Sequence, residues 1–256
     1  MAHSDVLKYE VSDAVARITL NRPEKRNALN DELVAALKQV LREMARDGKV
    51  RAAVLAGSGA DFCAGADLSA LQKISGASVA DNLEDANNLM ELFALLRDVR
   101  QPVIAAVRGR ALAGGCGLAL GCDLVIAEET ARFGFPEVKI GFVPAMVMAI
   151  LRRNVSEKKA FELIALGGEI SAIEAATLGL INRAMPVAEF DSFVRETAAR
   201  LTKLSASALT LSKNLLYKMD GLAFTEALAS GVDINVTARS TADCQTGIAR
   251  FLNKGS

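Results

Sequence analysis

The feature that most constrains the fold is a series of short apolar runs, which recur along the first half of the chain and are bounded by polar residues or glycine. The runs are AVARITL at 14–20, RAAVLA at 51–56, PVIAAV at 102–107 and DLVIA at 123–127. Their length is typical of buried β-strands, and segments of helical period at 31–47 and around 82–99 separate some of them. Strands that alternate with helices predict an α/β fold.

The pattern changes after about Gly141, where helical periods dominate. The segments with this period are 157–166, 171–178, 187–204, 206–219 and 224–253. We therefore predict two parts, a core at 1–195 and a C-terminal helical region at 196–256. The apolar faces of these helices, on a chain without net charge, favour a homo-oligomer.

Charge and hydropathy exclude several classes of partner. Thirty basic and thirty acidic residues cancel, so neither nucleic acid nor an anionic membrane is an expected partner. The start, MAHSDVLKYE, lacks the order of a secretory signal, and the longest apolar run, 142–151, is too short to span a bilayer. We expect a cytoplasmic location for this chain of 256 residues.

The single histidine removes much possible chemistry. His3 lies near the terminus, so a Ser-His-Asp triad, a Cys-His dyad and a histidine-based metal site are excluded, and we predict no metal. The cysteines show no CxxC pair, and we predict buried free thiols at Cys63, Cys116, Cys122 and Cys244.

The stretch ALAGGCGLALGCD at 111–123 concentrates glycine where a loop could hold a phosphate. Gly115, Gly117 and Gly121 read GxGxxxG, one residue too long for the dinucleotide fingerprint, and no GxxxxGK[ST] is present. A glycine-rich turn entering a helix also exposes backbone N–H groups that stabilise an oxyanion. A second such junction, GSGADFCAGADLS at 57–69, would allow two amides to converge on one oxygen.

These segments belong to an ordered set of four motifs, which resembles the crotonase superfamily, the enoyl-CoA hydratase/isomerase family. The motifs are NRPEKRNALN at 21–30, FCAGADLS at 62–69, RGRALAGGCGLALGCDLVIA at 108–127 and FGFPEVKIGFVP at 133–144. The resemblance covers nearly the whole chain and continues through STADCQTGIARFLNK at 240–254.

The resemblance implies a fold, a substrate class and a site. Family members form a spiral of β-β-α units followed by a helical region that trimerises, commonly into hexamers. They bind acyl-CoA thioesters, so that coenzyme A is part of the substrate and no separate cofactor is expected. An oxyanion hole holds the thioester enolate, and matching the motifs assigns its amides to Ala64 and Gly114.

The resemblance also assigns substrate-binding residues. Family members hold CoA with the RNAL and AGAD segments and the glycine turn, which here supply Arg26, Ala28, Ala64, Gly65, Ala66, Asp67 and Gly114. Arg26, with Lys25, is placed to meet the phosphates. Lys254 falls where family members often carry a basic residue that reaches a neighbouring subunit's CoA.

Two positions depart from the family pattern. Well-studied hydratases use two glutamates; one is present as Glu137, whereas Gly117 stands at the other position. The family's PGxGG turn is replaced by PAMVM at 144–148, so that bulkier apolar side chains stand in place of glycine near the expected acyl pocket. The combination resembles a bacterial branch that hydrates branched glutaconyl-type CoA esters, such as 3-methylglutaconyl-CoA.

We predict an enoyl-CoA hydratase, a carbon–oxygen lyase, with Glu137 as the general acid/base. The absence of a carboxylate at Gly117 keeps open a Δ3,Δ2-enoyl-CoA isomerase, which needs only one base. A third alternative is an acyl-CoA-binding protein without catalysis. A dehydrogenase is disfavoured by the glycine spacing.

Overall fold

The computed structural model describes residues 5–67, 72 and 76–253, so that His3 and Lys254 lie outside the described residues. Its centre is a six-stranded sheet in the order β1-β2-β3-β4-β6-β9, in which β1 pairs antiparallel and all other pairs are parallel. The strands are β1 (Leu7–Ser12), β2 (Val15–Leu20), β3 (Ala52–Gly57), β4 (Val103–Val107), β6 (Leu124–Glu128) and β9 (Arg183–Met185). The predicted strand runs therefore form neighbouring strands of one sheet.

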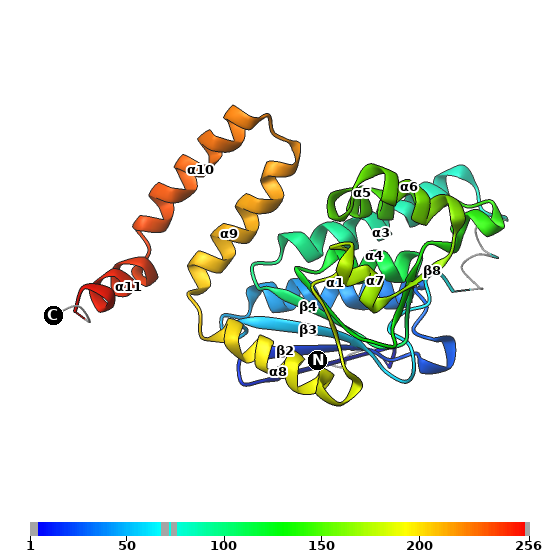
Figure 1. The fold of residues 1–256 in the computed structure, drawn as a ribbon, viewed down its shortest axis with the longest axis horizontal. Helices are drawn as coiled ribbons and strands as arrows, with labels where there is room; N and C mark the ends of the chain where they lie inside the picture. Colours follow the sequence, from blue (N-terminus) through cyan, green and yellow to red (C-terminus); the bar gives the residue numbers. More distant parts are fainter. Residues whose placement is uncertain (1–4, 68–71, 73–75, 254–256) are drawn as a thin grey trace.

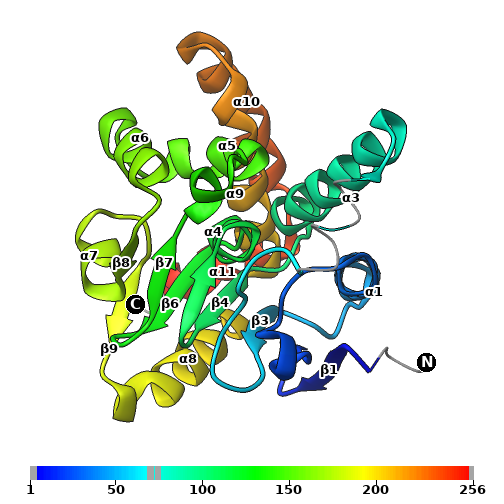
Figure 2. The ribbon, with the colours of Figure 1, turned by 90° about the vertical axis from the view of Figure 1, so that its right-hand side faces the viewer.

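Helices cover both faces of this sheet, as a parallel sheet with apolar residues on both faces requires. α1 (Asp31–Arg46), α3 (Val79–Asp98) and α4 (Gly114–Gly121) lie on one face, and α8 (Val187–Thr202) lies on the other (Figure 2). Alternate side chains of β3 point to opposite faces of the sheet, and each face has its own apolar core. Leu55 packs in the core on the side of α1, α3 and α4, whereas Val54 packs with Phe190 of α8 in the core on the other side.

The helix predicted at 31–47 is α1. Asn30 caps it, since the side-chain oxygen of Asn30 accepts a hydrogen bond from the Leu33 backbone N–H at 3.0 Å. The predicted apolar face, which includes Leu37 and Met44, is buried against the sheet. Periodicity and capping therefore predicted this element correctly.

A second, smaller sheet stands beside the first and carries the glycine-rich segments. It consists of β5 (Arg110–Leu112), β7 (Arg132–Gly134) and β8 (Glu169–Ser171). Isolated parallel bridges continue the pairing, from Ala111 to Cys63 and from Ala66 to Leu29. The AGAD segment is thus held between the NRPEKRNALN segment and β5.

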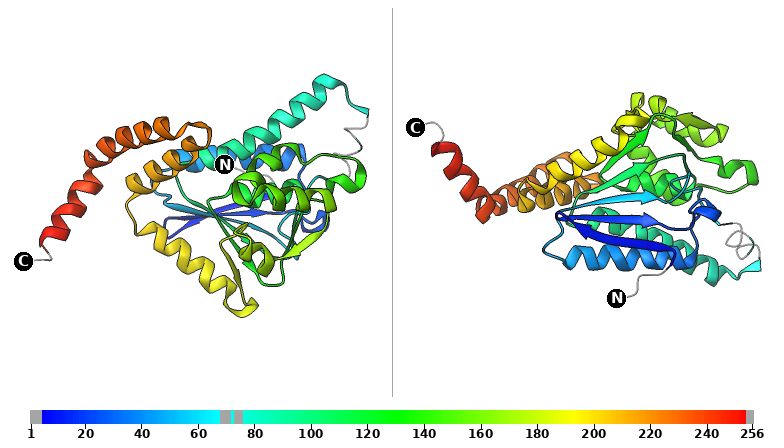
Figure 3. Two further views of the ribbon diagram at one scale, coloured as in Figure 1. Left: turned by 45° about the horizontal axis from the view of Figure 1, so that its top comes forward. Right: turned by 90° about the horizontal axis from the view of Figure 1, so that it is seen from below.

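Short helices connect the strands, and a helical arm completes the chain. Further helices are η1 (Pro23–Lys25), η2 (Pro136–Ile140), α5 (Ala145–Asn154), α6 (Glu157–Leu166), α7 (Ala172–Thr177), α9 (Ala206–Lys218), η3 (Met219–Gly221), α10 (Phe224–Arg239) and α11 (Ala242–Asn253). α9, α10 and α11 extend away from the core (Figures 1 and 3). The segment predicted as helical at 224–253 is broken at 240–241, between α10 and α11.

Buried polar contacts attach α9 to the core. Lys213 Nζ lies 2.8 Å from Asp123 Oδ2 and also donates to the carbonyl oxygens of Leu96 and Gln101. Tyr217 Oη donates to the other Asp123 oxygen at 2.8 Å. The predicted division after residue 195 falls inside α8, where Ala198 packs in the same cluster as Phe190, so the core continues through α8.

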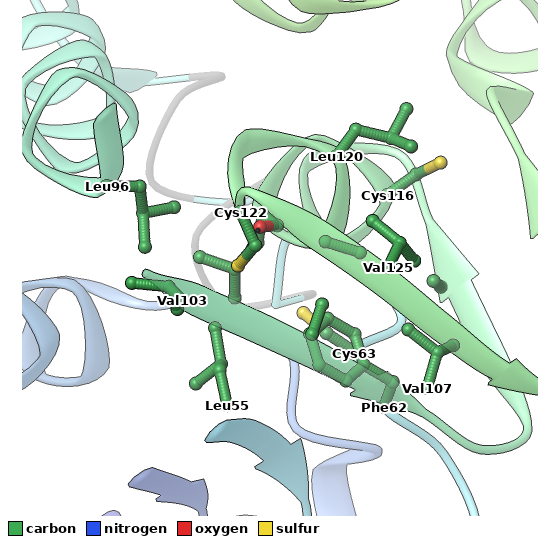
Figure 4. Packing of buried hydrophobic residues seen from close by; sticks show 14 of the residues in the cluster. Leu55, Phe62, Cys63, Leu96, Val103, Val107, Cys116, Leu120, Cys122 and Val125 are labelled. Carbon is green, nitrogen blue, oxygen red and sulfur yellow. Dashed lines mark hydrogen bonds between the residues drawn. The ribbon is translucent and has the colours of Figure 1, made fainter. Parts of the chain in front are cut away.

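The thiols lie where the cysteine pattern predicted, with one exception. Cys63, Cys116 and Cys122 are free and buried among apolar side chains (Figure 4), whereas Cys244 in α11 is only half-buried.

Among the residues that the structure describes, no helix is both long enough and apolar enough to cross a membrane.

Candidate active site

The first turn of α4 presents backbone N–H groups at the end of β5. The first hydrogen bond of the helix runs from the Gly117 N–H to the Ala113 carbonyl oxygen. The N–H groups of Gly114, Gly115 and Cys116 therefore take no part in the hydrogen bonds within the helix. Ala113 adopts φ 50° and ψ −127°, an uncommon conformation for alanine, and its own N–H donates to Gly134 at the end of β7. This bend sets the N-terminus of α4 at the end of β5 and beside the end of β7.

The AGAD loop runs directly beside this turn. Cys63 is bonded to β5 on both sides, through its N–H to Arg110 and through its carbonyl oxygen to Leu112, each at 3.0 Å. Gly65 has φ +97°, and a Cβ atom there would lie 2.9 Å from the Ala113 Cβ. Only glycine permits both the conformation and this approach. The two glycine-rich junctions are therefore brought together, as the sequence predicted.

The hydrogen bonds of the AGAD loop correct the choice of amide. Ala64, the predicted second oxyanion donor, already donates its N–H to the Arg26 carbonyl oxygen at 3.0 Å. Leu29 bonds to Gly65 and Asp67, so the N–H of the intervening Ala66 points away from Leu29, toward the side of β5 and Ala113. Among the four described amides of 64–67, that of Ala66 alone has no acceptor, and Ala66 is exposed.

Glu137 supplies a buried carboxyl group near the same turn. It lies in η2, three residues beyond Gly134, and is 8% exposed. Its Oε2 atom is buried without a hydrogen-bond partner in the described part of the chain. Burial raises the pKa of Glu137 above its usual 4.5, while its own backbone N–H lowers it in part. The carboxylate is close enough to Cys116 that its charge adds to the effect of burial in raising the pKa of that thiol.

Asp67 occupies a different environment from the one predicted for a CoA-binding residue. It is buried, and its Oδ2 atom lies 2.6 Å from Nη2 of Arg22. The Arg22 Nη1 atom also donates to the Ala28 carbonyl oxygen at 2.5 Å. Sequence reasoning missed Arg22, although the NRP motif contains it. The ion pair ties the end of the AGAD loop to the NRPEKRNALN segment.

The loop at 22–29 is fixed from within by Asn27, another residue that the sequence analysis did not single out. Asn27 is fully buried, accepts from the Arg22 N–H, and donates to the carbonyl oxygens of Ser58 and Asp61. Arg26 and Asn27 both have positive φ, of 52° and 54°. The turn leaves the predicted phosphate-binding side chains of Lys25 and Arg26 exposed and buries Ala28.

A cavity of about 260 Å³ lies on the other face of the sheet, under α8. Its lining includes Arg108, which pairs with Asp191 at 2.5 Å and stacks over the Phe190 ring at 4.8 Å. The sheet separates this cavity from Glu137 and α4, so it does not belong to the candidate site.

Comparison with known proteins identifies the family of this chain. The sequence model of the enoyl-CoA hydratase/isomerase family matches residues 10–256. The chain belongs to this family. A relative from Thermus thermophilus, grouped by name with the enoyl-CoA hydratases, is 40% identical over 94% of this chain and 95% of its own length. The 2,3-dehydroadipyl-CoA hydratase of Escherichia coli is 35% identical over 94% of this chain and 92% of its own.

A solved structure agrees with this family membership. The crystal structure of an enoyl-CoA hydratase from Mycobacterium smegmatis superimposes with a TM-score of 0.94, at 30% identity, covering 98% of this chain and 97% of that one. The predicted α/β crotonase fold with a helical C-terminal region is therefore confirmed. Members of the enoyl-CoA hydratase/isomerase family act on acyl-CoA thioesters.

Proposed function

We propose that this protein adds water across the double bond of a 2-enoyl-CoA thioester. The observation that carries the proposal is that the turn with the Gly114 amide and the AGAD loop with the Ala66 amide lie against each other, near the buried carboxyl of Glu137. Two N–H groups aimed at one thioester oxygen stabilise the charge that develops on it. The Ala66 amide takes the place that the sequence analysis gave to Ala64.

Glu137 moves both protons of this reaction. Its carboxylate removes a proton from water while the oxygen bonds to C3, and the electron pair of the C2=C3 bond moves to the thioester oxygen as an enolate. The protonated Glu137 then returns the proton to C2, which restores both the thioester and the carboxylate. Because burial raises its pKa, the group is a stronger base than an ordinary glutamate.

The CoA moiety lies along the AGAD and RNAL segments. The amides and small side chains of 64–66 allow a pantetheine arm to approach the backbone closely, and the exposed Arg26 and Lys25 meet the phosphates. Asp67 acts through the loop rather than by contact with CoA, since Arg22 and burial enclose its carboxylate.

Replacement of Glu137 by Gln tests the proposal. We expect Glu137→Gln to lose hydration of crotonyl-CoA by at least about 10²-fold while retaining binding of the ester, since one general acid/base contributes roughly this factor. Glu129→Gln, which changes an exposed glutamate, is the control and should hydrate as wild type does. Undiminished hydration by Glu137→Gln would overturn the assignment.

A second candidate function is Δ3,Δ2-enoyl-CoA isomerisation, favoured by Gly117. One base suffices to take a proton from one carbon and return it two carbons away while the two amides hold the dienolate. Incubation with 2-enoyl and 3-enoyl esters, including a methylglutaconyl ester, separates the candidates because only hydration yields a 3-hydroxyacyl product. Tight binding without any turnover would indicate an acyl-CoA-binding protein.

The C-terminal arm supports a homo-oligomer, either a trimer or a hexamer. Phe224, Leu228, Val232 and Val236 recur every four residues along one side of α10 and are 79%, 56%, 63% and 62% exposed. α10 has no buried residue among those described, so this apolar stripe is uncovered in the single chain. Light scattering should give a multiple of 27.1 kDa, which Leu228→Glu should reduce toward the monomer.

A further inference from the structure

Gly117 faces two side chains that fill the space beside it. A Cβ atom added to Gly117 would lie 2.7 Å and 3.3 Å from the two methyl groups of Val147 and 3.0 Å from Cζ of Phe93. Val147 belongs to α5 and Phe93 to α3, and they are 4% and 6% exposed. Three helices therefore meet at the start of α4 with no room for a side chain at 117.

Both neighbours are buried in the core cluster, and Val147 cannot move away without cost. Val147 is β-branched and therefore restricted to one main rotamer in a helix, and it packs in the core cluster that also contains Ile150 and Leu151. Gly121, one turn further along α4, has a looser environment. A Cβ there would lie 3.1 Å from Leu96 Cδ1 and 3.8 Å from Ile150 Cδ1, both ends of flexible side chains. The tight contact is specific to position 117.

We propose that Val147 and Phe93 restrict this enzyme to a single carboxylate. They form an apolar wall in the space that a side chain at 117 would enter, so a second carboxylate is compatible with this site only when Val147 is made smaller. This inference rests on the proposed function, because it explains why every proton transfer is left to Glu137. Val147 thereby determines which chemistry the first turn of α4 supports.

A thermal-unfolding cycle tests the wall independently of activity. Gly117→Ala should lower the midpoint by about 4–10 °C, because a methyl group is forced into a filled core. In a protein that already carries Val147→Ala, Gly117→Ala should lower the unfolding midpoint by less than half as much. The matched control is Gly121→Ala, which should leave the midpoint within about 2 °C or raise it, since alanine favours helix.

Hydration of crotonyl-CoA tests the functional consequence. Gly117→Glu alone should lower the unfolding midpoint and should reduce the hydration rate by at least about tenfold relative to wild type. The double variant Gly117→Glu, Val147→Gly should hydrate at least about tenfold faster than Gly117→Glu alone. A wild-type midpoint in Gly117→Ala, or equal penalties in both Val147 backgrounds, would overturn the wall. If Glu137→Gln still hydrates crotonyl-CoA, the proposed function is wrong. The thermal-unfolding cycle would still show whether Val147 and Phe93 exclude a side chain at 117.

Discussion

Removing the guanidinium of Arg22 tests whether Asp67 holds the AGAD loop in place or contacts CoA directly. The Arg22 and Asp67 side chains are 12% and 6% exposed, and their ion pair spans 2.6 Å. Breaking a buried ion pair by removing one partner costs about 3–5 kcal/mol, because the remaining charge loses its compensation. For a chain of this size each kcal/mol lowers the unfolding midpoint by about 2–4 °C, so Arg22→Met should lower it by roughly 6–20 °C.

The same substitution should lower kcat rather than raise KM. Asp67 follows Ala66 directly, so a loosened loop end displaces the Ala66 amide from the thioester oxygen. Complete loss of one such donor costs about 10²–10³-fold in kcat, which sets the upper limit for Arg22→Met. Steady-state kinetics with crotonyl-CoA and thermal melts by circular dichroism give both quantities. Arg195→Met, at an exposed arginine of α8, is the matched control and should change neither.

A small effect or a pure KM effect would refute this reasoning. If Arg22→Met unfolds within about 2 °C of wild type, the ion pair does not hold the loop. If KM rises while kcat is unchanged, Asp67 acts as a ligand of CoA, as the family motif alone suggested. Replacing both partners with apolar residues should recover much of the lost midpoint, because no uncompensated charge remains in that variant.

Other perturbations have equally definite outcomes. Because the pKa of Glu137 is raised, the folded state binds its proton more tightly than the unfolded state does, and the stability of the wild type falls as the pH rises past 4.5. Glu137→Gln should therefore have a higher unfolding midpoint than wild type at about pH 8, and this difference should shrink as the pH is lowered toward 4.5. Lys213→Met leaves Asp123 without its buried cation and should cost about 3–5 kcal/mol in urea unfolding. Gly115→Ala would place its methyl group against the Cys63 carbonyl oxygen and should cost at least ~3 kcal/mol. Gly231→Ala in α10, with open space around it, should be neutral or stabilise by up to about 1 kcal/mol, since alanine favours helix.

Much of the fold follows from local patterns in the sequence. The apolar runs at 51–56, 102–107 and 123–127 became β3, β4 and β6 within one or two residues, and the period at 157–166 gave α6 with the same bounds. The three-residue strands β5, β7, β8 and β9 carry too few residues for a period. The break between α10 and α11 likewise has no glycine or proline to mark it.

The candidate site shows where such patterns stop being sufficient. Glycine content located both glycine-rich loops, but which amide of the AGAD loop is left without an acceptor depends on strand register. Neighbouring amides of an extended segment point in opposite directions, and the bond from Ala64 to Arg26 fixes which of them is occupied. That partner is 38 positions away in the chain, and nothing in the AGAD motif itself reveals it.

Gly117 shows most clearly how a packing contact changes the meaning of a sequence pattern. Taken position by position, the sequence shows two departures from the family, a missing carboxylate at 117 and a valine at 147, which favour different conclusions about the reaction. The structure places the two residues in contact, so that the valine fills the space that the missing side chain leaves. They are therefore one change in packing, because a glutamate at 117 would require that bulk first be removed at 147.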